Sequence, residues 1–157
     1  MTHSAGHNAG AGQYTIAAFQ NTAATAAGSG DNTTVTGNAV DITALSARYN
    51  AAVLSIGSVA TMASGESLAV TALVQTSANN SDWSTLVASQ TVYTHTASGG
   101  AATAAAAGGD VSVDLSKAYQ YIRCAVKPDL SRAGTDTATI AGTWALHNPD
   151  RITASNA

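Results

Sequence analysis

Charged residues are scarce in this sequence. Lys, Arg, Asp and Glu together make up 10% of the 157 residues, against roughly 25% in ordinary globular domains. Six basic and nine acidic residues leave a formal net charge of −3, so self-repulsion is weak and the surface can pack closely against copies of itself or a partner. The basic residues are scattered and form no stripe, which argues against specific binding to nucleic acid.

Cysteine is also scarce, and the sequence contains no basic leader segment and no long apolar run. Cys124 is the only cysteine, which excludes an internal disulfide and fits synthesis in a reducing cytoplasm. The first residues, MTHSAGHNAGAGQYTIAAF, contain no basic segment followed by an apolar run, so we predict no secretory signal. No window reaches the roughly 20 apolar residues that a membrane-spanning helix needs. We therefore expect a soluble protein with no membrane partner.

The clearest pattern lies between Glu66 and Leu86, ESLAVTALVQTSANNSDWSTL. Leu68, Val70, Ala72 and Val74 occupy every second position there, and this alternation predicts a strand that is buried on one face. The polar cluster from 77 to 82 predicts a turn. We expect the indole of Trp83, just after that turn, to close one end of a sandwich core.

Similar short segments occur along the rest of the chain. They predict strands at 14–19, 33–40, 49–59, 86–96, 111–115, 119–127 and 137–147, with Pro128 ending the one before it because proline lacks a ladder donor. The segment 41–45 could begin a helical turn capped by Asp41 or form a connecting corner. With about eight strands and no amphipathic helix, we predict an all-β fold, an antiparallel jelly-roll-like β-sandwich.

Composition divides the chain into two parts. Residues 1–31 are rich in small and polar residues, and we predict a flexible N-terminal arm there, followed by a β-sandwich domain at 32–157. The low-complexity run 97–109, ASGGAATAAAAGG, predicts a surface loop. Eight aromatic residues make a lean core. A protein of this kind gains from association, so we expect a homo-oligomer or a protein that docks on a lattice.

Histidine and cysteine offer few candidates for chemistry. His3 and His7 have a spacing that could ligate a metal on a helix, but the segment is glycine-rich and has no third ligand nearby. His95 and His147 fall on predicted strands and are interpreted as half-exposed strand residues. Cys124 alternates with apolar neighbours and is interpreted as a small buried hydrophobe.

The acidic and glycine-rich segments are no more suggestive. Asp129, Asp136 and Asp150 lie in or near predicted loops, at a spacing that matches no compact calcium cage. Gly99–Gly100 and Gly108–Gly109 lack the lysine and the strand-to-helix setting of a phosphate loop. Arg123 and Arg132 could form salt bridges to Asp129 or Asp136 and hold that loop. We predict no catalytic, cofactor-binding or metal-binding residue, and a protein that is not an enzyme.

Two stretches resemble a known family. Asp41–Leu86 contains RYNAAVLSIGSVATMASGESLAVTALVQTS and DWSTL, and Tyr119–Ile140 contains YIRCAVKPDLSRAGTDTATI. They are similar to small head proteins of tailed bacteriophages that are interpreted as capsid decoration, or cement, proteins. The resemblance covers roughly 41–152. The N-terminal arm and the insert 97–109 depart from it, so no binding residue is carried over.

The resemblance implies a role on the virion. Such a protein is made in the cytoplasm of the bacterial host, sits on the outer surface of the phage capsid and bridges neighbouring subunits of the major capsid protein. A homotrimer is expected, with a dimer as the alternative. The mechanism would be avidity, in which modest contacts are repeated by symmetry, and the arm 1–31 would grip the lattice.

A second hypothesis is a carbohydrate- or receptor-binding module of a phage tail or fibre. Trp83, Tyr93, Tyr121 and Trp144 could supply a surface on which sugars stack, although Trp83 and Trp144 follow the apolar phase of their strands and are expected in the core. A tail-tube subunit would bring a longer chain and a helix packed on the sheet, which this pattern lacks.

Overall fold

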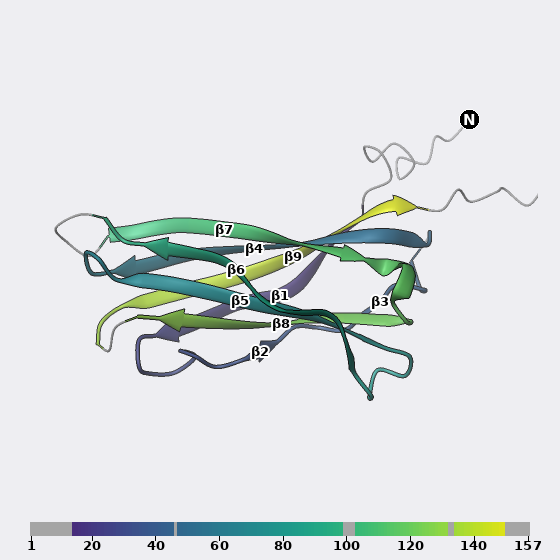
Figure 1. Ribbon diagram of the computed structural model, residues 1–157, viewed down its shortest axis with the longest axis horizontal. Coiled ribbons are helices and arrows are strands. Elements are labelled where there is room, and N and C mark those ends of the chain that lie inside the picture. The colour runs from purple at the N-terminus through teal and green to yellow at the C-terminus, as the bar shows by residue number, and fades with distance from the viewer. Residues whose placement is uncertain (1–13, 46, 99–102, 132–133, 150–157) are drawn as a thin grey trace, which may run out of the picture.

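The computed structural model describes residues 14–45, 47–98, 103–131 and 134–149, except for the side chains of 20, 21 and 103–105. These residues form two antiparallel sheets packed face to face (Figure 1). In the described part of the chain, the one helix with named bounds is the single-turn 3-10 helix η3 (Leu115–Lys117). No helix there is long and apolar enough to cross a membrane.

Each sheet is built from strands that are distant in sequence. The first has the order β1-β9-β4-β7, with bounds β1 (Tyr14–Thr25), β9 (Thr137–Pro149), β4 (Tyr49–Met62) and β7 (Thr103–Asp114). The second has the order β2-β8-β5-β6, with β3 also paired to β8, and bounds β2 (Val35–Thr36), β3 (Val40–Asp41), β8 (Tyr121–Leu130), β5 (Ser67–Ser77) and β6 (Ser84–Thr96).

The connectivity is that of a jelly roll. The chain crosses between sheets at almost every connection, β5–β6 being a hairpin within one sheet, and the first strand pairs with the last. If β2 and β3 are counted as one interrupted strand, the eight strands follow the double Greek-key path found in viral capsid and lectin domains and in cupins. The predicted fold class is therefore confirmed.

Alternation along the strands builds the core. In β5 the even-numbered residues Leu68 to Val74 are buried and the odd-numbered ones are half-buried. β4 and β9 show the same period, and Leu54, Ile140, Trp144 and Leu146 are fully buried between the sheets. Burying each such side chain contributes roughly 1.5–3 kcal/mol, so these strands hold the two sheets together.

The predicted loop at 97–109 is wrong for its second half. β7 begins at Thr103 and pairs with β4 in unbroken register, from Thr103 opposite Met62 to Asp114 opposite Ala51. Alanine and glycine have low β propensity, but twelve consecutive cross-strand partners outweigh it. A Cβ on Gly109 would lie 2.9 Å from the Val92 carbonyl oxygen, so this position tolerates no side chain where β7 meets β6.

The prediction that Pro128 ends its strand is also wrong. β8 continues to Leu130, with Pro128 opposite Val70 of β5. The Pro128 carbonyl accepts a hydrogen bond from the Asn32 N–H at 2.8 Å, on the side away from β5. Since the nitrogen and carbonyl of one strand residue point the same way, the missing N–H also faces away from β5 and costs no ladder bond.

The boundary predicted at residue 31 needs correction. β1 pairs with β9 from Tyr14 opposite Leu146 to Thr25 opposite Thr137, with two register shifts. Phe19 and three alanines of this region, Ala18, Ala24 and Ala26, are buried. Residues 14–31 therefore belong to the sandwich, and only 1–13 of the predicted arm lie outside the described residues.

The strand predicted at 33–40 is also reduced, to the two short ladders β2 and β3. The Asp31 carboxylate explains part of this irregular path, because it accepts hydrogen bonds from the Ala27 N–H at 2.7 Å and the Leu130 N–H at 2.8 Å. One side chain thus ties the turn after β1 to the end of β8.

Candidate functional site

Cys124 is fully buried in β8, as predicted. Burial raises the pKa of its thiol to about 12. The thiol therefore stays protonated at neutral pH, and a protonated thiol is neither a good nucleophile nor a good metal ligand.

The histidines are not brought together. His95 lies on β6 opposite Leu68, and His147 lies on β9 opposite Ala51 in the other sheet. His3 and His7 lie outside the described residues. Within the described ranges, no three His, Cys, Asp or Glu side chains are close enough to hold a metal ion.

The predicted loop carboxylates separate as well. Asp129 is exposed, whereas Asp136 is only 3% exposed and accepts a hydrogen bond from the Ala63 N–H at 3.1 Å. Its backbone carbonyl accepts from the Ala26 N–H at 2.9 Å, so Asp136 ties the start of β9 to two turns. Asp150 is outside the described residues.

The salt bridges expected for Arg123 are not formed with Asp129 or Asp136. Its Nε donates to Gln75 Oε1 at 2.9 Å, and its guanidinium carbon lies 3.9 Å from the centroid of the Trp83 ring. Trp83 is consequently half-buried under an arginine and does not close the core as expected. Arg132 lies outside the described residues.

The four aromatic residues of the carbohydrate hypothesis do not share one surface. Trp144 is fully buried in the core, as predicted. Tyr93 and Tyr121 are half-buried on β6 and β8. Trp83 borders a surface hollow, and it does so beside a different tyrosine, Tyr119.

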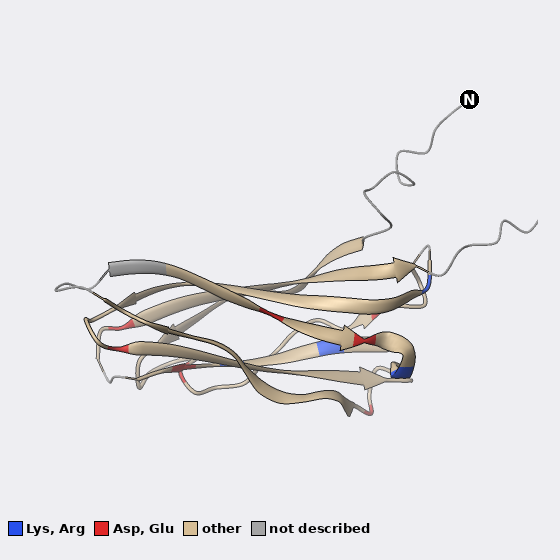
Figure 2. Cartoon of the chain, turned by 45° about the horizontal axis from the view of Figure 1, so that its top comes forward, with Lys and Arg blue, Asp and Glu red and all other residues tan. Residues whose placement is uncertain are grey.

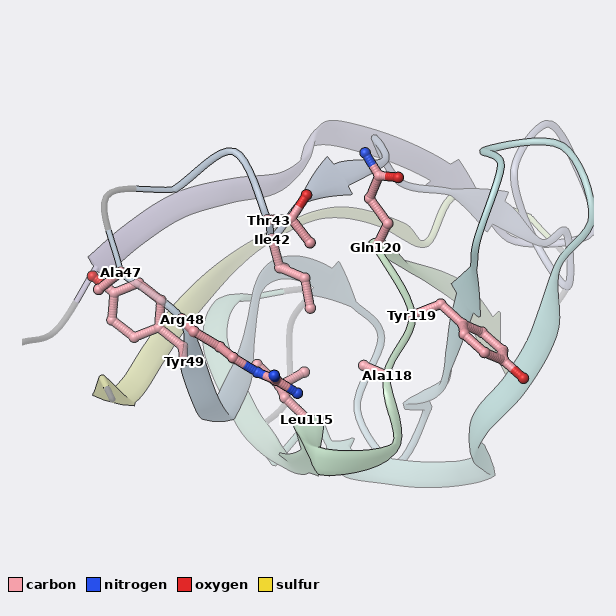
Figure 3. A pocket seen from close by; sticks show the side chains of 9 residues that line it. All are labelled: Ile42, Thr43, Ala47, Arg48, Tyr49, Leu115, Ala118, Tyr119 and Gln120. Atoms are coloured by element: carbon pink, nitrogen blue, oxygen red, sulfur yellow. The ribbon is translucent and has the colours of Figure 1, made fainter. Parts of the chain in front are cut away.

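Tyr119 marks the part of the surface best suited to binding. Its side chain is 58% exposed, and it stands between two hollows at the end of the sandwich where β9 ends and η3 lies (Figure 1). The first hollow has a volume of about 390 Å³ and is lined by Ile42, Thr43, Ala47, Arg48, Tyr49, Leu115, Ala118, Tyr119 and Gln120 (Figure 3). We use the name Tyr119 surface for the residues that line this hollow and the second hollow, which is described below.

Asp41 fixes the rim of the first hollow. Its Oδ1 accepts hydrogen bonds from the Thr43 N–H at 2.9 Å, the Thr43 hydroxyl at 2.7 Å and the Ala44 N–H at 3.1 Å, and its Oδ2 accepts from Gln120 Nε2 at 2.8 Å. The hydrogen bonds from Gln120 and Thr43 lower the pKa of the Asp41 carboxyl. The segment 41–45 is thus a connecting corner capped by Asp41, one of the two predicted forms.

The opposite wall follows from η3. Asp114 caps this turn by accepting from the Ser116 N–H at 2.9 Å, which leaves Leu115 buried at the base of the hollow. The Tyr119 N–H donates to Thr76 Oγ1 at 2.8 Å. The backbone of Tyr119 is therefore held in place while its ring remains in solvent. In Figure 3 the Arg48 side chain points across the hollow toward Leu115.

The second hollow has a volume of about 410 Å³ and is lined by Ala78, Asn79, Asp82, Trp83, Ser84 and Tyr119. Asn79 organises its turn, since its Oδ1 accepts from the Asp82 N–H at 2.8 Å and its Nδ2 donates to Asp82 Oδ2 at 2.7 Å. Trp83, on which the Arg123 guanidinium stacks, lines this hollow.

The side chains of this surface include the types that make contacts, because Tyr, Trp and Arg carry most energy in protein interfaces. The one hydroxyl–carboxylate pair described above, Thr43 with Asp41, forms part of the cap of the corner, since the same carboxylate oxygen also accepts from two backbone N–H groups. Nothing in the sequence pattern singles out Tyr119 or Arg48. A tyrosine placed on a strand face carries no signal of exposure, and the hollow depends on segments 41–49 and 115–120 meeting in space.

Comparison with known proteins assigns the chain to no family. No family model matches the chain, and no curated protein matches it. Among solved structures, the chain is similar to infectious bursal disease virus Gx strain, with a TM-score of 0.47 and 15% identity over 85% of this chain and 32% of that chain. Similar matches are to T=1 particles derived from that virus (TM-score 0.47, 16% identity, 85% and 30% covered) and to its VP2 subviral particle (TM-score 0.46, 16% identity, 85% and 32% covered). The chain spans about a third of the length of those proteins, and similarity at this level does not indicate a shared function.

Proposed function

We propose that this protein is a non-enzymatic structural component of a virus particle. It binds the outer surface of a tailed-bacteriophage capsid and bridges neighbouring subunits of the major capsid protein, which stabilises the shell. The sequence resemblance over 41–152 supports the phage assignment. Jelly-roll domains serve many functions, so the fold is compatible with this role but does not distinguish it from other roles.

The observation that carries the proposal is the Tyr119 surface. An exposed tyrosine between two hollows offers a rigid aromatic anchor, and Arg48 and the Arg123–Trp83 pair lie on either side of it. Arg48 forms no ion pair within the described part of the chain. We propose that a capsid segment inserts an apolar side chain over Leu115 and places a carboxylate against Arg48.

Binding to shells tests this proposal directly. Shells of the parent phage assembled without the chain would be mixed with purified protein and pelleted, and the bound fraction measured as a function of concentration. Tyr119→Ala should weaken binding by about 30-fold or more, the size of a hot-spot loss, and Arg48→Glu should weaken it as strongly. Lys127→Glu, a charge reversal on β8 away from this surface, is the matched control. Failure of the wild-type chain to bind any such shell contradicts the proposal.

A carbohydrate- or receptor-binding role in a phage tail or fibre is the second candidate. The hollow beside Trp83 favours it, because an aromatic ring there lies close to the polar side chains of Asn79 and Asp82. The opposing observation is that Arg123 covers one face of the indole and the two polar side chains bond to each other.

Trp83 also provides the assay that separates the two roles. Trp144 is fully buried, so a change of tryptophan emission on adding soluble ligand reports on Trp83. Saturable quenching by a sugar, lost in Trp83→Phe, would establish the second role. An unchanged emission across a sugar panel, together with binding to shells, would establish the first.

A further inference from the structure

The β1-β9-β4-β7 sheet carries little charge (Figure 2). Asp110 and Asp114, both exposed on β7, are the charged residues of its four strands. At the centre of its outer face Val59 is 55% exposed, the most exposed aliphatic side chain of appreciable size in the described chain. A hollow of about 870 Å³ lies beside it, over β4, β7 and β9. Exposed apolar area of this kind marks an interaction surface more often than chance.

The relief of this face is set by two adjacent rows of outward residues. The knob row consists of Thr139, Val59 and Ala106, which are cross-strand neighbours on β9, β4 and β7. The hollow row lies two residues away along each strand and consists of Ala141, Gly57 and Gly108. On all three strands the residue of the knob row is the larger, so a ridge and a groove lie side by side.

Nothing in the part of the chain that the structure describes requires a glycine at 57. Its register with both neighbouring strands is unbroken, its φ is not positive, and a Cβ placed there would meet no heavy atom within 4 Å. Glycine within a strand costs about 0.5–1 kcal/mol relative to alanine. Where no bulge or bend explains it, glycine in a strand marks the close approach of another backbone or a ligand.

We propose that the occupant is a second copy of this chain, paired face to face. A twofold axis in the plane of the interface, perpendicular to β4 at Ser58, stacks the two β4 strands antiparallel. It places Val59 of each copy over Gly57 of the other. The same rotation sets Thr139 over Ala141 and Ala106 over Gly108, because each pair spans the same two rows. The ridge of each copy thus fills the groove of its partner, as an isologous interface requires.

Charge and area agree with this pairing. Asp110 lies on the row of Ser55, and the axis at residue 58 would place its counterpart on the row of Thr61, so the two carboxylates would be roughly 20 Å apart along the strands.

About nine residues of overlap, at about 3.4 Å each, across four strands about 4.8 Å apart give a contact of roughly 600 Å² per copy. The total of about 1,200 Å² lies at the lower limit for stable specific interfaces.

This pairing goes beyond the proposed function and does not depend on it. It would place the two Tyr119 surfaces at opposite poles of the dimer, because the β4 strands run in opposite directions. A dimer with one docking surface at each pole can join two neighbouring subunits of a shell, which a monomer with a single docking surface cannot do.

Exchanging the knob and the hollow tests the inference. Sedimentation equilibrium of the full chain over a range of concentrations should show a monomer of 15.5 kDa in equilibrium with a dimer. Gly57→Val fills the groove with a residue that favours strands, so the fold should be retained while dimer affinity falls more than about tenfold. Val59→Gly should weaken the dimer similarly. The double variant Gly57→Val/Val59→Gly restores one knob over one hollow at each contact, and the dimer should return.

Several outcomes would overturn the pairing. They are a wild-type chain that stays monomeric at about 100 µM, a trimer, unchanged association of folded Gly57→Val, or a double variant no better than the single ones. Thermal unfolding of each variant at low concentration shows that the fold is intact. Binding to shells is measured separately, so loss of the dimer and loss of capsid docking are distinguishable.

Discussion

Deleting β1 is the most direct test of how this sandwich is held together. A chain of residues 14–157 loses no contact between described residues, whereas a chain of residues 32–157 lacks β1 and the turn that follows it. Phe19 buries its side chain, worth roughly 1.5–3 kcal/mol, and buried Ala18, Ala24 and Ala26 add about 0.8 kcal/mol each. These side chains alone account for about 4–5 kcal/mol, and the whole β1–β9 ladder is lost as well, so the total approaches the stability of a domain with the usual 5–15 kcal/mol.

Circular dichroism during heating is the assay. The 14–157 chain should unfold cooperatively near the midpoint of the full chain, and the 32–157 chain should show no cooperative transition. Phe19→Ala in the full chain should cost about 3–5 kcal/mol and lower the Tm by roughly 10 °C. Ala17→Ser, exposed on the same strand, should change stability by less than about 0.5 kcal/mol. A 32–157 chain that unfolds at the full-length midpoint would refute this account of the core.

Two further predictions concern titratable groups. The folded Cys124 thiol keeps its proton up to a pKa of about 12, while the unfolded thiol ionises near its ordinary 9.0. The free energy of unfolding should therefore fall as pH rises through this interval. Cys124→Val should remove this contribution to the pH dependence of the free energy of unfolding. A thiol reagent at pH 8 should react with Cys124 only after denaturant is added. For Asp41, whose pKa is lowered, the stabilising effect should be present above pH 3.8 and be lost as pH falls through the lower folded value. An NMR titration should place the titration midpoint of the Asp41 carboxyl below 3.8. Asp41→Ala should abolish hydrogen-exchange protection of the Thr43 and Ala44 amides. Unchanged protection of these amides would count against the capping role of Asp41.

The fold was accessible from the sequence wherever side chains alternate. The sequence of β5 alternates strictly and that of β4 alternates in part, and both strands contribute to the core as predicted; β9 shows the same period in its burial. The buried positions of Cys124 and Trp144 follow from the same phase. Local pattern was enough in these strands because burial on one face is what selects their residues.

Other parts depend on partners that a local pattern does not contain. β7 is built of alanine and glycine, and only its pairing with β4 makes it a strand. β1 has weak alternation and two register shifts, so its place beside β9 is a property of the closed sandwich. Pro128 looked like a strand end because the sequence does not show which side its nitrogen faces.

The candidate site was less predictable than the fold. Arg123 was expected to pair with loop carboxylates, yet it lies over Trp83 because β8 and the turn before β6 meet at that end. Tyr119 is a candidate for binding because it borders two hollows, and the walls of these hollows come from three separate segments, 42–49, 78–84 and 115–120. A composition poor in charge predicts a contact surface but does not say where on the fold it lies.

The pairing of the first strand with the last decides how this molecule resists force. Tyr14 lies opposite Leu146, so the start of β1 and the end of β9 are side by side. Pulling these two ends apart would break the hydrogen bonds of the β1–β9 ladder one after another. Tension applied lengthwise from one pole of the sandwich would instead load all the bonds of a ladder together, because they lie perpendicular to the strands. Attachments that pull along the strands, from opposite ends of the sandwich, would therefore be resisted better than attachments that pull β1 and β9 apart from their shared end.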